Sequence, residues 1–151
     1  MEQEFQRVGL LGRREHPGVN QIVADLLALL DARGVDVVLE DRLATLSHFE
    51  KRAMQPREAI GESVDLAIVI GGDGSLLSAA RTLVRHHTPV IGVNRGRLGF
   101  LTDVSPDDLV GQVTAVLDGD YTRDSRFLLD TEVLRDGEVI GAAEALNDVV
   151  V

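Results

Sequence analysis

Cysteine is absent from the 151-residue sequence, and lysine occurs once, at Lys51. Without cysteine the chain has no disulfide framework, no thiol nucleophile and no thiolate-bound metal. Lys51 lies outside any glycine-rich loop, so the phosphate-binding loop of P-loop nucleotidases is excluded. The turn after the first expected strand, residues 9–14, also lacks the glycine spacing of the Rossmann dinucleotide fingerprint.

Positive charge and long apolar runs are scarce as well. Acidic residues outnumber lysine and arginine by 25 to 15, and the net charge is −10. This balance argues against a nucleic-acid-binding surface and against an electrostatic membrane anchor. No apolar run is long enough for a membrane span, and residues 1–5 lack the apolar segment of a signal peptide. We therefore expect a cytoplasmic protein that binds neither nucleic acid nor membrane.

The most informative stretch is residues 66–77, LAIVIGGDGSLL. Its first five residues form a continuous apolar run, which is typical of a strand buried on both faces of a parallel sheet. Three glycines and an aspartate follow within four positions. Apolar residues then recur at helical spacing, at Leu76, Leu77, Ala80, Leu83 and Val84. The pattern predicts a strand, a tight turn and a helix, and open α/β sheets bind ligands at such turns.

Asp73 is the residue of this turn that needs an explanation. Glycine lets the backbone approach a ligand closely, and the N-terminus of a helix favours phosphate. A carboxylate in a phosphate site repels the ligand unless it binds a metal or accepts a proton. The alternative is that Asp73 or Ser75 caps the following helix and that the glycines serve only the turn.

Strands and helices alternate on both sides of this stretch. We expect further strands at 7–12, 35–40 and 89–93. One helix should be capped by Asn20 and end at Gly34, and another should begin at residues 105–108 and end at Gly119. We also expect a short helix at 57–61 and one helical turn or two around Leu43, Leu46 and Phe49. The pattern predicts an α/β fold over residues 1–120: a three-layer, Rossmann-like open sheet with helices on both faces.

The pattern changes near Tyr121. Residues 126–134 are typical of a strand, Asp136-Gly137 is a hairpin turn signal, and residues 138–140 begin a return strand. We expect the start of a β-rich, antiparallel second domain over residues 121–151. The chain ends in an apolar run, residues 149–151, that is typical of a buried strand, so we expect a fragment truncated at Val151.

Three motifs in this sequence resemble those of the NAD kinase family. Residues 71–75, GGDGS, resemble the signature that NAD kinases share with diacylglycerol and sphingosine kinases and with phosphofructokinases. Residues 94–103, NRGRLGFLTD, resemble the NAD kinase pattern more specifically. Asn147-Asp148 falls where the family has an asparagine–acid pair, with aspartate in place of the usual glutamate. The motifs occur in family order and span nearly the whole chain.

The resemblance implies transfer of the γ-phosphate of ATP to the 2′-hydroxyl of the adenosine ribose of NAD, which makes NADP. It also implies a divalent cation, with Mg²⁺ expected, and a homo-oligomer, a dimer or tetramer, in the full-length protein. Asp73 would take the proton from the attacking hydroxyl. Donor phosphates would bind at Gly71, Gly72 and Ser75, and NAD would contact Asp73, Gly74, Phe100, Asn147 and Asp148. No metal ligand is identified.

Two other functions stay open on the sequence. One is a lipid or sugar kinase on the same scaffold, against which the 94–103 loop and the acidic chain argue. The other is a non-catalytic nucleotide-binding module, against which the carboxylate of Asp73 argues, since a pure binding site would not need it beside phosphate.

Overall fold

The computed structural model describes residues 4–43, 52–96, 99 and 101–150. The helical turn expected at Leu46 and Phe49, and the contact expected of Phe100, lie outside these residues. The chain divides into two compact units, Met1–Tyr121 and Thr122–Val151. Among the described helices, none combines the length and apolarity needed to cross a membrane.

The first unit is built on a five-stranded, all-parallel sheet with the strand order β3-β2-β1-β4-β5. The strands are β1 (Arg7–Gly12), β2 (Asp36–Glu40), β3 (Ala53–Gln55), β4 (Leu66–Gly71) and β5 (Val90–Asn94). The chain winds outward from β1 to β3 and then returns to the other side of β1 with β4. The winding therefore reverses between β1 and β4, and ligands of open α/β sheets bind at the carboxyl ends of the strands beside such a point.

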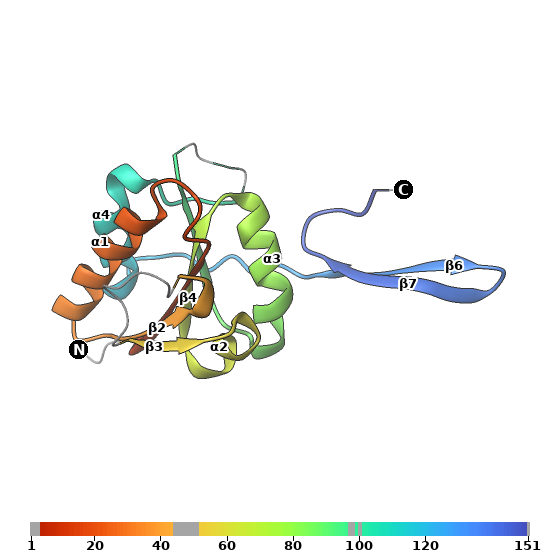
Figure 1. Ribbon diagram of the computed structural model, residues 1–151, viewed down its shortest axis with the longest axis horizontal. Helices are drawn as coiled ribbons and strands as arrows, with labels where there is room; N and C mark the ends of the chain where they lie inside the picture. The colour runs from red at the N-terminus through yellow and green to blue at the C-terminus, as the bar shows by residue number, and fades with distance from the viewer. Residues whose placement is uncertain (1–3, 44–51, 97–98, 100, 151) are drawn as a thin grey trace. The chain divides into compact units, whose positions relative to one another are not determined.

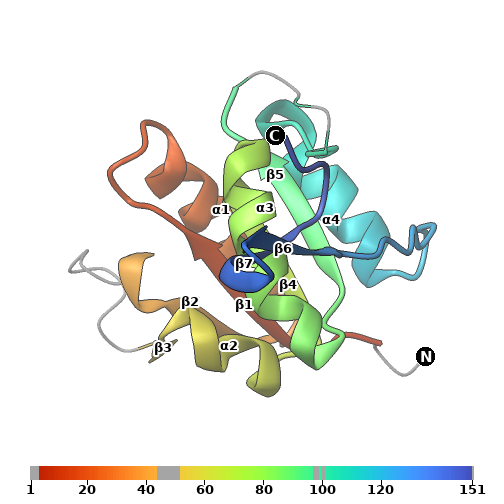
Figure 2. The same cartoon turned by 90° about the vertical axis from the view of Figure 1, so that its right-hand side faces the viewer.

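Helices cover both faces of this sheet (Figures 1 and 2). Helices α1 (Val19–Ala32) and α4 (Leu109–Leu117) pack on one face, and α2 (Arg57–Ser63) and α3 (Asp73–Leu83) pack on the other. Because strand side chains alternate between faces, β4 divides its residues between two cores: Leu66, Ile68 and Ile70 belong to the first, and Ala67 and Val69 to the second. The predicted three-layer α/β fold is confirmed.

The ends of the helices follow local turn chemistry. Helix α1 begins at Val19, and its N-cap is Gly18 with φ 79°, so the prediction that Asn20 caps this helix is wrong. Only a residue that tolerates positive φ can hold that position, and Val19 is needed in the core. Gly34 and Gly119, with φ 69° and 86°, follow α1 and α4 as predicted.

Other predicted elements differ in detail. A 3₁₀ turn, η3 (Pro106–Asp108), precedes α4, and the Ser105 hydroxyl accepts a hydrogen bond from the Asp107 N–H at 3.4 Å. Helix α3 ends at Leu83, and Val84 starts a second 3₁₀ turn, η2 (Val84–His86), with 37% of its surface exposed. Val84, which was expected at helical spacing, therefore lies outside this helix, and the buried residues of α3 are Ala79 and Leu83.

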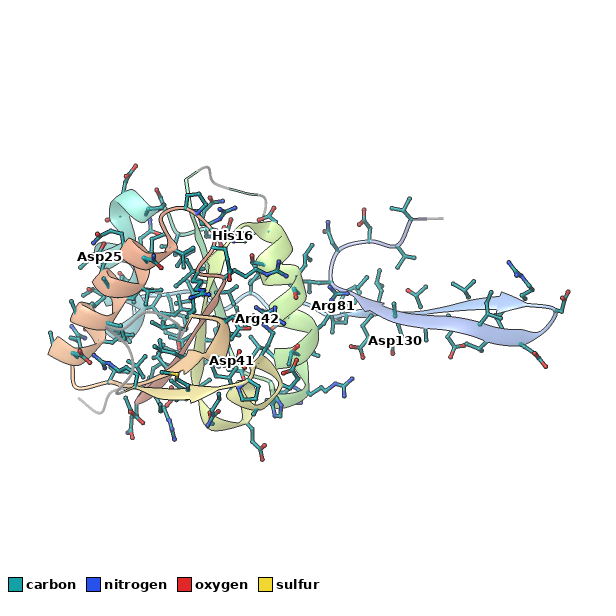
Figure 3. The ribbon with its side chains drawn as sticks, viewed as in Figure 1. His16, Asp25, Asp41, Arg42, Arg81 and Asp130 are labelled. Carbon is teal, nitrogen blue, oxygen red and sulfur yellow. The ribbon has the colours of Figure 1, made fainter. Side chains whose placement is uncertain are left out.

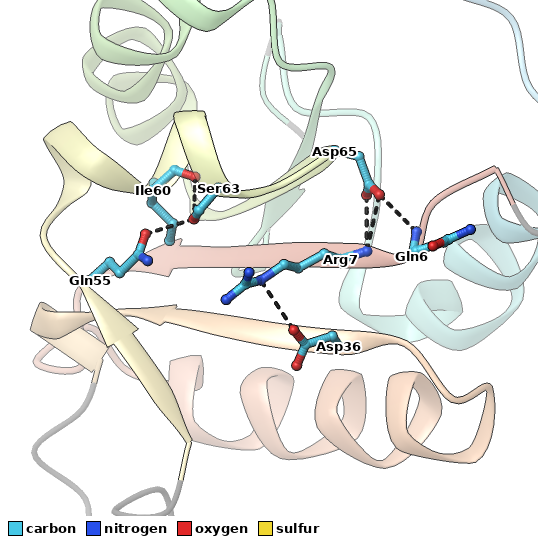
Figure 4. A network of polar contacts seen from close by, with 7 residues as sticks. All are labelled: Gln6, Arg7, Asp36, Gln55, Ile60, Ser63 and Asp65. Atoms are coloured by element: carbon cyan, nitrogen blue, oxygen red, sulfur yellow. Dashed lines mark hydrogen bonds and ion pairs between the residues drawn. The ribbon is translucent and has the colours of Figure 1, made fainter.

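The amino-terminal edge of the sheet is held by side-chain contacts (Figure 4). The Asp65 carboxylate, just before β4, accepts hydrogen bonds from the backbone N–H groups of Gln6 and Arg7 at 2.9 and 3.1 Å. The Arg7 Nε lies 3.1 Å from the Asp36 carboxylate at the start of β2. These contacts join the starts of three adjacent strands at the edge opposite the predicted ligand site.

The second unit contains an antiparallel hairpin of β6 (Leu129–Arg135) and β7 (Glu138–Ala145). The predicted Asp136-Gly137 turn is confirmed, with φ values of 53° and 83°. No described residue after Ala145 is in a strand, and Val149 and Val150 are 43% and 87% exposed. The expectation of a buried strand there is wrong for the described residues, because no neighbouring strand pairs with them.

Candidate functional site

The turn after β4 carries the first predicted motif. Gly72 is the N-cap of α3 in an extended conformation, and its carbonyl accepts hydrogen bonds from the N–H groups of Ser75 and Leu76 at 3.0 and 3.2 Å. No side chain forms a capping hydrogen bond at this helix, whose first residue is Asp73. The alternative that Asp73 or Ser75 serves as its cap is therefore wrong.

The three glycines of the turn have different environments. A Cβ on Gly71 would lie 2.6 Å from the Cβ of Ser75, so only glycine fits there. A Cβ on Gly72 or Gly74 would meet no atom of a described residue within 4 Å. Neither of these two has a positive φ. Open space beside the backbone, and not an unusual backbone conformation, therefore distinguishes Gly72 and Gly74.

Asp73 connects this turn to the second predicted motif. Its Oδ1 accepts hydrogen bonds from the backbone N–H of Leu101 at 3.0 Å, from that of Thr102 at 3.2 Å and from the Thr102 hydroxyl at 3.3 Å. A Cβ on Gly99 would lie 2.7 Å from the Asp73 Cγ, so glycine is required where the loop passes the carboxylate. Asp73 and Leu101, which are 28 residues apart, thus join the two motifs in one polar cluster.

The loop after β5 is also held by hydrogen bonds from Asn94, the last residue of that strand. The Asn94 amide donates to the Thr102 hydroxyl oxygen at 3.0 Å, and its Oδ1 accepts from the Gly96 N–H at 3.0 Å. Asn94 and Thr102 are only 7% and 1% exposed. Because Gly71 pairs with Asn94 in the sheet, both loops leave from the same edge.

A buried ion pair that the sequence analysis missed lies at this same edge. Glu40, the last residue of β2, is fully buried, and Arg57, the first of α2, is 7% exposed. The guanidinium donates to both carboxylate oxygens at 2.8 and 3.1 Å, and Glu40 also accepts from the Gly12 N–H at 2.9 Å. A third donation, at 2.8 Å, reaches Ser78 on α3. No local pattern signals a pair whose members are 17 residues apart.

An open hollow of about 440 Å³ lies beside this ion pair. We call it the arginine hollow. Five charged residues line it: Arg13, Arg14, Glu15, Asp41 and Arg42. Figure 3 labels Asp41 and Arg42, which form part of the 3₁₀ turn η1 (Asp41–Leu43) after β2. The pKa of Glu15 is lowered, chiefly by a hydrogen bond from its own backbone and further by Arg14. The arginines were not predicted as site residues.

Two other predicted site residues belong to the second unit of the chain. Asn147 and Asp148 are exposed residues of the second unit, after β7, so their joint site with Asp73 stays a prediction. The described residues contain no group of three or more histidines and carboxylates that could hold a metal ion. A protein-built metal centre therefore does not fit this part of the chain.

The parallel sheet and the glycine turn after β4 together define the class of domain. A parallel sheet with a glycine turn opening a helix beside its switch point is the architecture of a nucleotide-binding α/β domain. The sequence model of the ATP-NAD kinase N-terminal domain matches residues 8–121. The chain belongs to the NAD kinase family.

Individual relatives agree with this family. An NAD kinase of Chromohalobacter salexigens is 50% identical over 151 residues, which are 99% of this chain and 51% of that protein. One of Ectopseudomonas mendocina is 48% identical over 148 residues, 98% of this chain and 50% of that protein. The fold resembles the crystal structure of yeast NADH kinase complexed with NADH, with a TM-score of 0.78 at 18% identity, over 97% of this chain and 48% of that one. The chain spans about half the length of the curated relatives it matches.

Proposed function

We propose that this chain forms the donor-phosphate half of an NAD kinase, which transfers the γ-phosphate of ATP to the 2′-hydroxyl of the adenosine ribose of NAD. Membership of the family supports the reaction. The observation that supports the site is the position of Asp73, whose carboxylate is held by the loop at the carboxyl edge of the sheet.

Asp73 is the proposed general base. In the transfer, the ribose O2′ attacks the γ-phosphorus, its proton passes to the Asp73 carboxylate, and ADP leaves. The hydrogen bonds from Leu101 and Thr102 fix the orientation of this carboxylate. A positioned base of this kind contributes roughly 10²–10⁴-fold to the rate.

The donor phosphates are proposed to bind beside Gly72 and Gly74, where a side chain is absent and the adjoining space is open. The N-terminus of α3 supplies backbone donors and a positive dipole end there. Gly71 and Ser75 are proposed to contact the donor phosphates as well. Because the Ser75 N–H bonds to the Gly72 carbonyl, the hydroxyl of Ser75 would make its contact. Mg²⁺ that accompanies a nucleoside triphosphate takes many of its ligands from phosphate and water, which suits an edge without a built metal centre.

The acceptor side of the site remains a proposal carried by the resemblance. Phe100 would contact NAD from the loop after β5, and Asn147 and Asp148 would hydrogen-bond its ribose hydroxyls. Gly74 would lie beside NAD as well as beside the donor. The resemblance also implies a homo-oligomer, and the composition predicts a cytoplasmic location.

The test is the formation of NADP⁺ from NAD⁺ and ATP by this chain joined at Val151 to the C-terminal half of the Chromohalobacter salexigens relative. We expect NADP⁺ to accumulate in proportion to enzyme, as measured with an NADP-specific dehydrogenase. Phosphorylation of diacylglycerol or a sugar by the joined enzyme, without NADP⁺, would assign the chain to another kinase function. Nucleotide binding without any phosphoryl transfer would favour a non-catalytic module.

A further inference from the structure

We propose that Arg57 is a positioning residue for the phosphoryl transfer, because its guanidinium holds the first turns of α3, and with them Asp73, at a fixed place beside the ends of β1 and β2. The inference rests on the proposed function, since it concerns the rate of that transfer. Arg57 is buried and acts through Ser78 of α3 rather than on a reacting atom.

The Arg57 guanidinium bridges the end of a strand and a helix. Its Nε and Nη2 donate to the two Glu40 carboxylate oxygens at 2.8 and 3.1 Å, and its Nη1 donates to the Ser78 hydroxyl oxygen at 2.8 Å. All three guanidinium nitrogen atoms are therefore engaged at once. Because the guanidinium is planar and rigid, its position on Glu40 determines where the Ser78 hydroxyl can lie.

Glu40 is itself held in place by a neighbouring strand. It is fully buried at the end of β2, and the carboxylate oxygen that Arg57 Nη2 engages also accepts the Gly12 N–H of β1 at 2.9 Å. Strands β1 and β2 are paired in the sheet. A hydrogen bond to this carboxylate therefore fixes Arg57 to two adjacent strands, and Arg57 relates their position to that of α3.

Ser78 lies close to the proposed site along α3. It is the fourth residue after Gly74 and the fifth after Asp73, within one continuous helix. Residues four apart lie above one another on the same helix face, about 6 Å apart along the axis. The hydrogen bond to Ser78 therefore holds the helix little more than one turn from the proposed base and from the proposed position of the donor phosphates.

The other end of α3 is held by close packing instead. A Cβ on Gly61 of α2 would lie 3.1 Å from the Leu83 Cδ2 and 2.8 Å from the His86 Cδ2. Leu83, the last residue of α3, is only 1% exposed. Apolar burial is not directional, whereas a hydrogen bond is. The bond from Arg57 to Ser78 thus supplies orientation at the end of α3 where the chemistry is proposed.

The energetics of the buried ion pair also favour a role in geometry. A well-packed apolar pair of similar volume is often as stable as a buried ion pair or more so, and an ion pair can instead select one arrangement. Ser78 lies outside the pair, so its hydroxyl can be removed without leaving a buried charge unpaired. Positioning can therefore be tested at Ser78 separately from the stability of the Glu40–Arg57 pair.

The test is steady-state kinetics of Ser78→Ala in the joined enzyme, with the folded fraction measured by thermal unfolding. We expect kcat to fall by about tenfold, since a small displacement of reacting groups can cost about 10²-fold. The KM for ATP should rise, because the donor phosphates bind at the displaced end of α3. The KM for NAD⁺ should change less, because its proposed contacts are shared with the second unit. A merely less stable enzyme would lose kcat with neither KM changed.

The matched control is Ser63→Ala at the opposite end of α2. The Ser63 hydroxyl donates to the Gln55 Oε1 at 2.7 Å, so this variant loses a hydrogen bond of similar length that does not reach α3. Its unfolding midpoint should fall about as much as that of Ser78→Ala, since each variant loses one partly buried hydrogen bond. Its kcat and both KM values should stay near those of the parent. Equal kinetic effects in the two alanine variants would contradict the proposal.

A double-mutant cycle tests whether Arg57 and Ser78 act through one contact. Arg57→Lys keeps a positive charge beside Glu40 but replaces the rigid fork of donors with a single ammonium group. If the contact carries the effect, Arg57→Lys lowers kcat, and the addition of Ser78→Ala lowers it no further. Losses that multiply in the double variant, or an unchanged kcat and KM for ATP in Ser78→Ala, would overturn the proposal.

The parent enzyme separates this inference from the proposed function. If the joined parent makes NADP⁺ and Ser78→Ala matches its kcat and its KM for ATP, the NAD kinase stands and the positioning role fails. If the joined parent makes no NADP⁺, the NAD kinase proposal fails, and a positioning role in that transfer fails with it.

Discussion

At the scale of single residues, Asp73 both holds a loop and is the proposed base, and a substitution can separate these roles. In Asp73→Asn the amide oxygen can still accept the N–H groups of Leu101 and Thr102, but it cannot take the hydroxyl proton. We expect kcat of the joined enzyme to fall by about 10² or more, with little change in NAD affinity or unfolding midpoint. Initial rates of NADP⁺ formation and thermal unfolding measure the two effects. A loss of less than about tenfold would assign Asp73 to holding the loop alone.

Asp73→Ala provides the matched comparison. This variant loses the acceptor as well as the base, so the N–H groups of Leu101 and Thr102 are left without it. An unsatisfied buried donor costs about 1–3 kcal/mol, and the alanine variant should therefore unfold at lower temperature than the asparagine variant. Equal midpoints for the two would show that these hydrogen bonds do not hold the loop.

Gly99 and Gly96 form a second matched pair within the same loop. A methyl group at Gly99 would lie 2.7 Å from the Asp73 Cγ, whereas one at Gly96 would meet no atom of the described residues within 4 Å. Gly99→Ala should displace either the carboxylate or the loop and lower kcat/KM by about tenfold or more, the effect expected of a misplaced reacting group. Gly96→Ala should leave kcat/KM near the parent value. Steady-state kinetics of both variants in the joined enzyme test the contact, and equal effects would contradict it.

At the scale of elements, the buried Glu40–Arg57 pair joins β1, β2, α2 and α3. Removing one partner of a buried ion pair leaves the other charge uncompensated, which costs about 3–5 kcal/mol. Glu40→Gln should lower the free energy of unfolding by that amount, as measured by urea denaturation. The control is Asp36→Asn, which breaks the half-exposed pair with Arg7 and should cost less than about 1 kcal/mol. Comparable losses of unfolding free energy in the two variants would show that the buried pair stabilises the fold no more than the half-exposed pair does.

The elements that the sequence predicted well are those whose signals are local. The apolar run of β4, the glycine turn and the following helix are contiguous, and the apolar face of α1 repeats within 14 residues. Strand β3 was missed because it has three residues, two of them exposed, and no apolar alternation. The bridge between Val93 and Val104 was missed because it depends on a partner across the second loop.

The residues of the candidate site also divide into those with a local sequence signal and those that depend on contacts between distant segments. Asp73 was singled out from the chemistry of its own turn, but its contacts with Leu101 and Thr102 join segments 28 and 29 residues apart. Glu40 ends an apolar strand and Arg57 follows a proline, and neither position suggests a buried pair. The arginine hollow combines residues that only the β1–β2 pairing brings together. Tertiary contacts decided each of these features.

At the scale of the whole molecule, the two units differ in how much they bury. The first has helices packed on both faces of its sheet. The hairpin of the second exposes apolar side chains: Val133, Leu134, Val139 and Ile140 are 52–61% exposed. A two-stranded hairpin alone is marginally stable, so we expect this unit to need further strands for a stable acceptor site.

The most direct measurement of the central claim compares NADP⁺ formation by the 151-residue chain alone and by the same chain joined to the C-terminal half of the Chromohalobacter salexigens relative. Both are assayed with NAD⁺, ATP and Mg²⁺ at equal enzyme concentration. If this chain supplies the base and the donor-phosphate site while the remainder completes the acceptor site, the joined enzyme makes NADP⁺ and the chain alone makes none. Sustained NADP⁺ formation by the purified, monodisperse 151-residue chain would contradict the account.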